Sequence, residues 1–294
     1  MTNVMKQLFL GASVAVGLSA TAFVAPAAAN PTYSTSGPGV LNYCSDGINT
    51  FSDGQGGMSC TDSLETILSG NNSAPGGNVE LYDGTDLLPL SDPAWNQRAT
   101  LEADFGNDHI ITFSSLTFGD WFSGDTSYGA DNLANQWFGD LLNSALGTEV
   151  RNRGASQGLN TDAAIFSAFL GMGGFQRLSD PNVAYVIKDD NKVTFGLAGH
   201  QDAGAINPLL TGLFASEVVK VTKDGESEFF YSFLPPTDSG QVNKDGFSHN
   251  GNYEFMLVWE DDPSTDTPEP ATILGLLAVG GAVVASRRQR SDKA

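Results

Sequence analysis

Apolar residues alternate with polar ones along much of the second half of the chain, with the period of two that is typical of β-strands. Residues 252–260 show this most clearly, because Tyr253, Phe255 and Leu257 share one face of the predicted strand. Turn sequences such as Lys223-Asp224-Gly225 join neighbouring segments into hairpins. The segments predicted as strands are 78–82, the two arms of a hairpin at 100–118, 183–187, 193–197, 217–222, 226–233 and 252–260.

The middle of the chain has a longer apolar period, which predicts helices. One helix has Asp131 as its N-cap, carries apolar residues at every fourth position from Leu133, and ends at Gly147. A second helix starts near Thr161 and ends at Gly171. Together they predict a two-helix insertion between the flanking strands.

These elements predict an α+β fold, in which a mostly antiparallel, sandwich-like β domain carries the two-helix insertion. Residues 30–77 are rich in Gly, Ser, Asn and Asp, and we predict them as loops with a thin core. The last strand runs directly into an acidic, proline-containing spacer at 261–267, which cannot form a core. Residues 30–260 are therefore predicted to form a single exported globular domain.

The first 29 residues have the three parts of a secretory signal peptide. Lys6 gives a positive start, an apolar run follows over 8–24, and small residues occupy 27–29. This arrangement predicts cleavage between Ala29 and Asn30. An uncleaved anchor helix is the alternative.

The last 27 residues have a complementary arrangement. Pro268-Glu269-Pro270 is followed by the uncharged segment 271–285 and then by Arg287, Arg288 and Arg290. As a helix, the uncharged segment would be about 22 Å long, against about 30 Å for the hydrocarbon core of a bilayer. We predict a marginal transmembrane segment whose arginines stay on the cytoplasmic side.

In this order, the Pro-Glu-Pro triplet, the glycine-containing apolar segment and the arginine cluster resemble the PEP-CTERM sorting signal of Gram-negative bacteria. The resemblance implies recognition, and cleavage near the triplet, by an exosortase, a membrane-embedded cysteine protease of organisms that make exopolysaccharide, biofilm or floc. It implies a protein tethered to the inner membrane in transit and then placed at the cell surface, outer envelope or extracellular matrix. A plain tail anchor is the alternative.

Residues 116–203 resemble, in addition, a domain of uncharacterised PEP-CTERM proteins. The resemblance rests on short motifs such as Leu116-Thr117-Phe118-Gly119-Asp120, Ser179-Asp180-Pro181-Asn182-Val183 and Gly196-Leu197-Ala198-Gly199-His200. It implies no activity for this chain.

Charge and cysteine usage narrow the classes of partner. The chain has 34 acidic residues against 14 basic ones, a net charge of −20, so nucleic acid and anionic lipid would be repelled.

Cys44 and Cys60 are the two cysteines, and both lie in the exported part. In an oxidising compartment they predict one disulfide. A metal site on them would need further ligands, and the loop between them offers none.

The sequence contains no familiar catalytic motif. There is no G-x-S-x-G, and His109, His200 and His249 lack the H-x-x-x-H or H-E-x-x-H spacing of a metal site. We interpret each histidine as an ordinary loop or strand-end residue and predict neither a catalytic residue nor a cofactor. Because the acidic residues offer too many pairs to single one out, glycoside hydrolysis stays open.

Calcium is a further candidate ligand. Asp83, Asp86 and Asp92, and the pair Asp189 and Asp190, lie in turn-like segments rich in the oxygen donors that calcium prefers. The pair is the best candidate for a structural calcium. Asp also makes turns without any ion.

Carbohydrate is the other candidate ligand. Trp95, Trp121 and Tyr128 lie in Gly- and Asp-rich stretches, where an exposed ring could stack on a sugar; burial in the core is the alternative. We expect a non-enzymatic cell-surface or biofilm-matrix protein that is handled by the export machinery and an exosortase. An exopolysaccharide-binding module and a secreted glycoside hydrolase are the alternatives.

Overall fold

Two β-sheets form the larger part of the protein. The computed structural model describes residues 31–81, 89, 92–106, 109–189, 191–202, 211–246 and 248–258. The five-stranded sheet has the order β1 (Thr32–Ser36), β7 (Thr100–Asp104), β8 (Ile110–Ser114), β11 (Val219–Lys223) and β12 (Glu226–Phe230). The eight-stranded sheet has the order β13 (Thr237–Asp238), β15 (Gly251–Val258), β10 (Lys192–Gly199), β9 (Asn182–Asp189), β6 (Gly77–Glu80), β2 (Leu41–Ser45), β3 (Asn49–Phe51) and β14 (Val242–Asn243). A separate two-stranded pair consists of β4 (Gly70–Asn71) and β5 (Ala74–Pro75).

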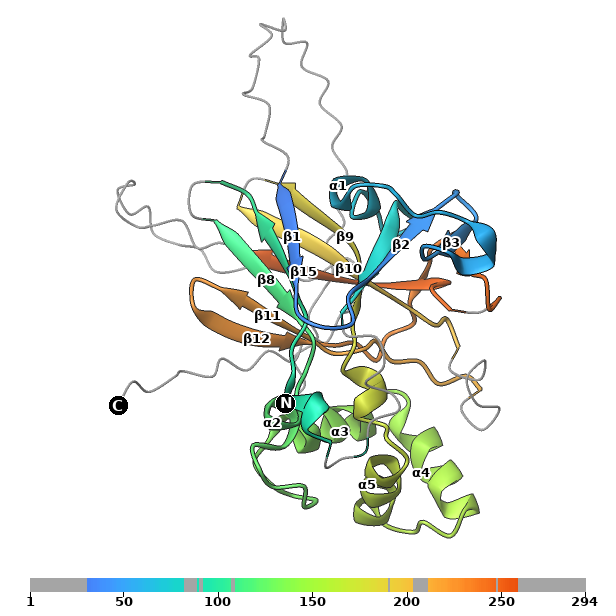
Figure 1. Ribbon diagram of the computed structural model, residues 1–294. Helices are drawn as coiled ribbons and strands as arrows, with labels where there is room; N and C mark the ends of the chain where they lie inside the picture. Colours follow the sequence, from blue (N-terminus) through green and yellow to red (C-terminus); the bar gives the residue numbers. More distant parts are fainter. Residues whose placement is uncertain are drawn as a thin grey trace, which may run out of the picture.

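The two sheets lie against each other (Figure 1), and aromatic side chains pack between them. Phe113 of β8 meets Phe195 of β10 edge to face, with ring centroids 5.0 Å apart. Phe230 of β12 and Phe255 of β15 contact the same Phe195 ring, at 5.5 Å and 5.3 Å. Since each sheet contributes two of these rings, the alternating apolar faces close over one core. Within the described residues β3 and β14 pair in parallel and the other strand pairs are antiparallel, so the predicted α+β fold is confirmed.

The hairpins predicted in the second half are present. β11 pairs with β12 across a turn in which Asp224 and Gly225 both have positive φ, 54° and 78°. Two consecutive positive φ values match the right-handed twist of the strands, which is why an Asp-Gly pair stands there. β9 and β10 also pair in antiparallel fashion, with Asp189 opposite Lys192.

The insertion between β8 and β9 contains four α-helices within the described residues, so the prediction of two is wrong. They are α2 (Phe118–Phe122), α3 (Leu133–Asn143), α4 (Gly147–Ser156) and α5 (Asp162–Gly171), and they lie together at one end of the sandwich (Figure 1). The predicted helices correspond to α3, whose N-cap is Asn132 rather than Asp131, and to α5, whose N-cap is Thr161.

Two local signals explain the missed helices. Thr117 and Asp120 form a reciprocal capping box that ends the extended chain and starts α2 within the predicted hairpin arm. Gly147 starts α4 instead of ending a helix, and α4 has few apolar residues to signal it. A Cβ at Gly154 would lie 2.7 Å from the Ile165 side chain, so glycine permits α4 to approach α5.

The prediction that residues 30–77 are loops is wrong in part. This region supplies β1, β2, β3 and the start of β6, together with the short helix α1 (Leu64–Ile67). Their sequences are rich in Ser, Thr and Asn and lack apolar alternation, and β1 gains its order by pairing with β7.

The predicted terminal signals lie outside the described residues. These are the signal peptide 1–29, its cleavage site at Ala29 and Asn30, the spacer 261–267 and the transmembrane segment 271–285. Within the part of the chain that the structure describes, no helix has the length and apolar character needed to span a bilayer.

Candidate functional site

The acidic cavity is a polar hollow of about 400 Å³ on the eight-stranded sheet, where β6 and β10 end and β9 begins. Four carboxylate side chains line it, and each comes from a different segment of the chain: Glu80, Asp180, Glu217 and Asp245. Glu80 ends β6, Asp180 precedes β9, Glu217 precedes β11, and Asp245 follows β14. The fold thus gathers at one place acidic residues that are far apart in sequence.

The strand register explains why polar side chains face this cavity. Glu80, Asn182 and Ala198 stand opposite one another on β6, β9 and β10, and residues directly opposite share a face of the sheet. Their sequence neighbours Val79, Val183 and Leu197 point the other way and are buried in the core between the sheets. The acidic cavity therefore lies on the face of the sheet opposite the apolar core.

Glu217 is tied to the start of β9. The backbone N–H of Asn182 donates a hydrogen bond of 2.9 Å to Glu217 Oε2, and Asn182 Nδ2 lies 3.4 Å from the same oxygen. Burial raises the pKa of Glu217 well above its usual range, and the charges of Asp180 and Glu80 raise it further against the opposing bond from Asn182. Such a carboxyl can hold a proton at a pH where exposed carboxyls are ionised.

The hydrogen-bonding capacity of the Asn182 side chain is only partly used. Its side chain is buried, 6 % exposed, and its Oδ1 has no hydrogen-bond partner. A buried acceptor without a donor costs about 1–3 kcal/mol.

His249 forms another part of the wall. It is buried and has a left-handed φ of 62°, and its Nδ1 lies 2.9 Å from Thr50 Oγ1 and 3.1 Å from Asn78 Nδ2. Since the Asn78 amide donates to Nδ1, the neutral ring carries its proton on Nε2. Burial lowers the pKa of His249 to about 4, helped by the nearby His200 and opposed by Asp245. The ring is therefore neutral at physiological pH.

An apolar cavity of about 200 Å³ adjoins the acidic cavity. Trp137 and Phe169 lie in its wall, stacked with ring centroids 5.4 Å apart. The two cavities share four wall residues, Arg177, Leu178, His200 and Ala215.

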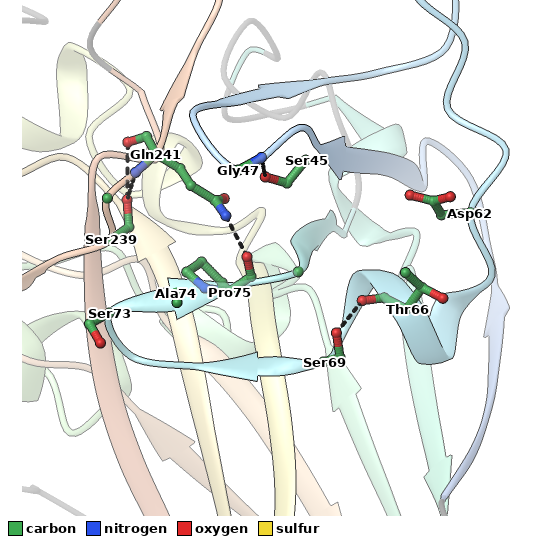
Figure 2. A pocket seen from close by; sticks show the side chains of 12 residues that line it. Ser45, Gly47, Asp62, Thr66, Ser69, Ser73, Ala74, Pro75, Ser239 and Gln241 are labelled. Carbon is green, nitrogen blue, oxygen red and sulfur yellow. Dashed lines mark hydrogen bonds between the residues drawn. The ribbon is translucent and has the colours of Figure 1, made fainter.

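A third hollow is the hydroxyl groove, of about 360 Å³, between α1, β4–β5 and the segment 239–241 (Figure 2). Hydroxyl side chains line much of it: Ser45, Thr66, Ser69, Ser73 and Ser239. The side chain of Gln241 crosses it to donate from Nε2 to the Pro75 carbonyl, while its Oε1 has no partner. None of the described residues that line this groove is aromatic.

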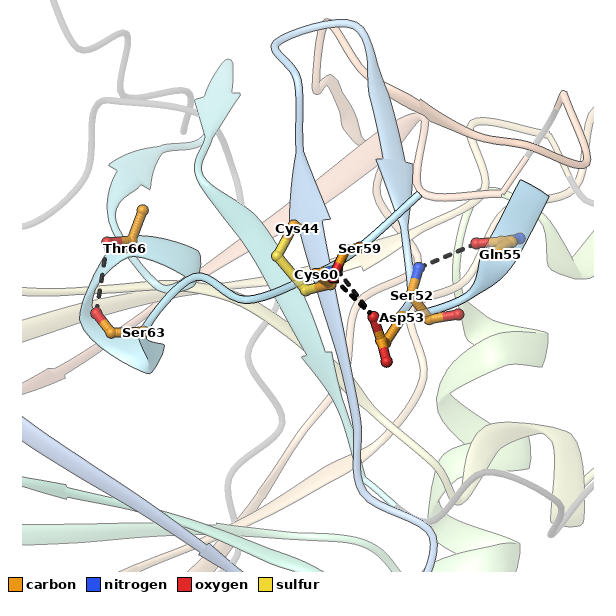
Figure 3. The surroundings of a disulfide bond; sticks show 8 residues. All are labelled: Cys44, Ser52, Asp53, Gln55, Ser59, Cys60, Ser63 and Thr66. Atoms are coloured by element: carbon orange, nitrogen blue, oxygen red, sulfur yellow. Dashed lines mark hydrogen bonds between the residues drawn. A yellow bond between two sulfur atoms is a disulfide. The ribbon is translucent and has the colours of Figure 1, made fainter. Parts of the chain in front are cut away.

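The predicted disulfide is present. Cys44 of β2 and Cys60 are bonded, with their Cα atoms 5.3 Å apart. Figure 3 shows Asp53 beside the bond, where its Oδ1 accepts hydrogen bonds from Ser59 Oγ and from the backbone N–H of Cys60. The bridge fixes the loop after β3 to the eight-stranded sheet.

Two of the three aromatic candidates for sugar stacking are in the core. Trp95 and Trp121 are fully buried, and Trp121 Nε1 donates a 2.8 Å hydrogen bond to Ser179 Oγ. These two rings therefore follow the alternative, burial in the core, and the expectation that they are exposed for sugar stacking is wrong. Tyr128 is 47 % exposed, although its ring also packs against Phe138 and Phe166.

The calcium candidates are not brought together in the described residues. Asp92 caps a short 3₁₀ helix (Pro93–Asn96), accepting from Ala94 N at 2.8 Å, and Asp189 pairs across the sheet with Lys192. Asp83, Asp86 and Asp190 lie outside those residues. The described part of the chain holds no group of three or more His, Cys, Asp or Glu side chains placed to bind a metal ion. Calcium at Asp189 and Asp190 stays a prediction, tested by comparing melting temperatures in calcium and in chelator.

The three histidines lie in loops or next to strand ends, as interpreted from sequence, but two of them meet at one site. His200 and His249 line the same acidic cavity, although 49 positions separate them, while His109 does not line it. The four carboxylates of that cavity were not singled out either. Nothing local marks them, because the register of three strands and the course of two loops bring them together.

Comparison with known protein families identifies a sorting motif near the end of the sequence. Residues 266–290 match the family model of the PEP-CTERM protein-sorting motif. The chain carries a PEP-CTERM sorting motif, the signal that marks exosortase substrates. The match includes the sorting residues Pro268, Glu269, Pro270, Arg287, Arg288 and Arg290, which lie outside the described residues. A PEP-CTERM protein of this kind is exported and directed to the cell surface.

No curated protein and no solved structure is detectably similar to this PEP-CTERM protein. The resemblance of residues 116–203 to an uncharacterised PEP-CTERM domain therefore stays a prediction.

Proposed function

We propose that this PEP-CTERM protein is a non-enzymatic component of the cell surface or extracellular matrix of a Gram-negative, biofilm-forming bacterium. The observation that carries the proposal is the sorting motif at 266–290. It follows a β-sandwich in which a disulfide fixes one loop to a sheet. A disulfide suits an oxidising, extracellular setting. The net charge of −20 keeps such a domain soluble and away from anionic surfaces.

Deleting the gene tests the matrix role. We expect the deletion to weaken biofilm cohesion or alter the envelope, and the wild-type gene to restore it. A gene in which Pro268, Glu269 and Pro270 are replaced by alanine should fail to restore it, whereas the matched spacer variant Ser264→Ala should succeed. A deletion strain with unchanged envelope and matrix would contradict the proposal.

Exopolysaccharide binding is a second candidate, and the hydroxyl groove supports it. Its hydroxyl and amide groups are of the kind that exchange hydrogen bonds with sugar hydroxyls, and Gln241 Oε1 is an acceptor without a partner. Retention of the protein by immobilised matrix polysaccharide tests it. We expect Gln241→Ala to reduce retention and the exposed variant Glu102→Gln to leave it unchanged.

Glycoside hydrolysis is favoured by one observation, the carboxylates of the acidic cavity. A carboxyl with a raised pKa, such as Glu217, beside other carboxylates is the pattern that general acid catalysis uses. If the protein releases reducing ends from matrix polysaccharide and Glu217→Gln does not, the non-enzymatic proposal fails.

A further inference from the structure

The acidic cavity has an excess of negative charge and of hydrogen-bond acceptors. Among its wall residues, four carboxylates stand against a single cationic side chain, Arg177. Two histidines, His200 and His249, also line the wall, and burial keeps His249 neutral. Anions and acceptor-rich ligands would be repelled from such a surface.

The second observation is independent of charge. Asn182 Oδ1 belongs to a cavity-wall side chain that is more than nine-tenths buried, and it has no donor. Buried acceptors in native proteins are nearly always paired, so an exception calls for an explanation, and a donor bound in the cavity is one. The Asn182 amide lies against Glu217, so that group would have to carry donors and tolerate a neighbouring carboxylate.

Carboxylate, guanidinium and imidazole side chains line the cavity together with Glu217. They are Glu80 of β6, Arg177 of the 3₁₀ helix Gln176–Leu178, Asp180 before β9, His200 after β10, Asp245 after β14 and His249 before β15. This set has the composition of a cation site. The described residues nevertheless contain no cluster with the arrangement for a metal ion. An organic cation carries the positive charge that these carboxylates favour, and it does not need the ligand arrangement of a metal ion.

We propose that the acidic cavity binds a primary ammonium group between the carboxyl groups of Glu217 and Asp180, where its positive charge offsets the repulsion between them. An ammonium group has three donors and no acceptor, which complements a wall that offers carboxylate oxygens and the Asn182 amide oxygen. The cavity of about 400 Å³ holds a whole small frame around that group, such as an amino-sugar unit. The inference does not depend on the matrix role.

Isothermal titration calorimetry on the protein isolated from the native cell surface tests this. Three probes separate the charge from its frame: a glucosamine trimer, its fully N-acetylated counterpart, and the simple polyamine spermidine. The acetylated trimer has the same sugar frame without the ammonium groups. We expect the glucosamine trimer to bind at least about tenfold more tightly than the acetylated trimer.

The result with spermidine identifies the source of the ammonium group. If spermidine binds as well as the glucosamine trimer, the ammonium group alone is recognised. If it binds at least tenfold more weakly, the sugar frame contributes, and an amino-sugar polymer is the natural ligand. Both results support the proposal. It is overturned if neither amine binds, or if the acetylated trimer binds as tightly as the free amine.

Variants locate the site. Glu217→Gln and Asp180→Asn should each weaken glucosamine-trimer binding at least about tenfold, because each removes a charge partner while keeping the side-chain shape. Glu102→Gln, on the distant strand β7, removes an exposed carboxylate and should leave binding unchanged. Equal weakening in all three variants would show a general charge effect and overturn the assignment. Should Asp180→Asn fail to fold, Glu80→Gln replaces it with the same expectation.

Discussion

Lys220 Nζ lies 3.0 Å from Asp120 Oδ1, and this contact joins β11 of the five-stranded sheet to α2 of the helical end. Asp120 also pairs with Arg98 through its other oxygen, which in addition accepts from the backbone N–H and hydroxyl of Thr117. One largely buried carboxylate therefore organises a strand, a helix start and the segment before β7.

Asp120→Asn should destabilise the protein by about 2–3 kcal/mol, since it removes a buried charge partner while the two cations keep some contact with water. Burial acts to raise the pKa of Asp120, but the charges of Arg98 and Lys220 and the bonds from Thr117 outweigh it, so the pKa is lowered. A lowered pKa gives stability above the unfolded value of about 3.9, and that stability is lost as pH falls below it.

Urea unfolding at pH 7 and below pH 4 measures both effects of Asp120→Asn. The variant and the wild type should approach each other in acid. Asp162→Asn is the matched control, because its pair with Arg151 is exposed and is worth less than about 1 kcal/mol. Equal losses in the two variants would contradict the role given to Asp120.

Reducing the disulfide between Cys44 and Cys60 should lower the free energy of unfolding by about 3 kcal/mol, as expected for a loop of this length. Urea curves recorded with and without dithiothreitol measure it. The double variant Cys44→Ser/Cys60→Ser should match the reduced wild type and no longer respond to the reductant. A reductant effect that persists in the double variant would have another cause.

Glu217→Gln should stabilise the protein increasingly as pH rises. The pKa of Glu217 is raised by burial and by Asp180 and Glu80, so its favourable contribution is present below the unfolded pKa of about 4.3 and lost as pH rises through the folded value. Glutamine keeps the acceptor for Asn182 N–H without the buried charge. Melting temperatures from pH 4 to pH 8 test this; a difference between variant and wild type that does not grow with pH would refute it.

His249 should make the protein acid-sensitive. Its pKa of about 4 in the folded state lies below the unfolded value of about 6.5, so stability falls as pH drops from 6.5 towards 4, by on the order of 3 kcal/mol. His249→Asn suits the left-handed backbone and cannot titrate there. Its unfolding free energy should change less across this pH range than that of the wild type.

Intact-mass measurement on protein from the native cell surface and medium tests the processing at both ends. Cleavage before Asn30 and near Pro268 should leave a species spanning about residues 30–268 with one disulfide. A mass that still contains residues 271–294 would identify a tail-anchored protein instead.

The strands that could be predicted from sequence are those whose partners are neighbours along the chain. β11 and β12 are joined by Asp224-Gly225, and both alternation and turn are local signals. β1 pairs with β7 and β3 with β14, across long stretches of chain and with mostly polar sequences, so no local pattern marks them. α4 was missed for the same reason, since its apolar positions are few.

The acidic cavity could not be predicted because no single segment contains it. Glu80 and Asn182 meet only through the register of β6 with β9, and Glu217 joins them from the segment before β11 of the other sheet. The disulfide and the sorting motif, in contrast, depend on residue types and spacings that the sequence displays directly.

The place of β15 in its sheet has a consequence for the timing of biogenesis. β15 is the last strand before the sorting signal, yet it lies inside the eight-stranded sheet, between β10 and β13. A chain leaving the export channel N-terminus first cannot complete that sheet until Val258 has emerged. The sorting motif at 266–290 follows β15 closely, so we expect the docking of β15 and the recognition of the sorting motif to overlap in time. Substitutions that slow the docking of β15 should therefore alter sorting as well as stability.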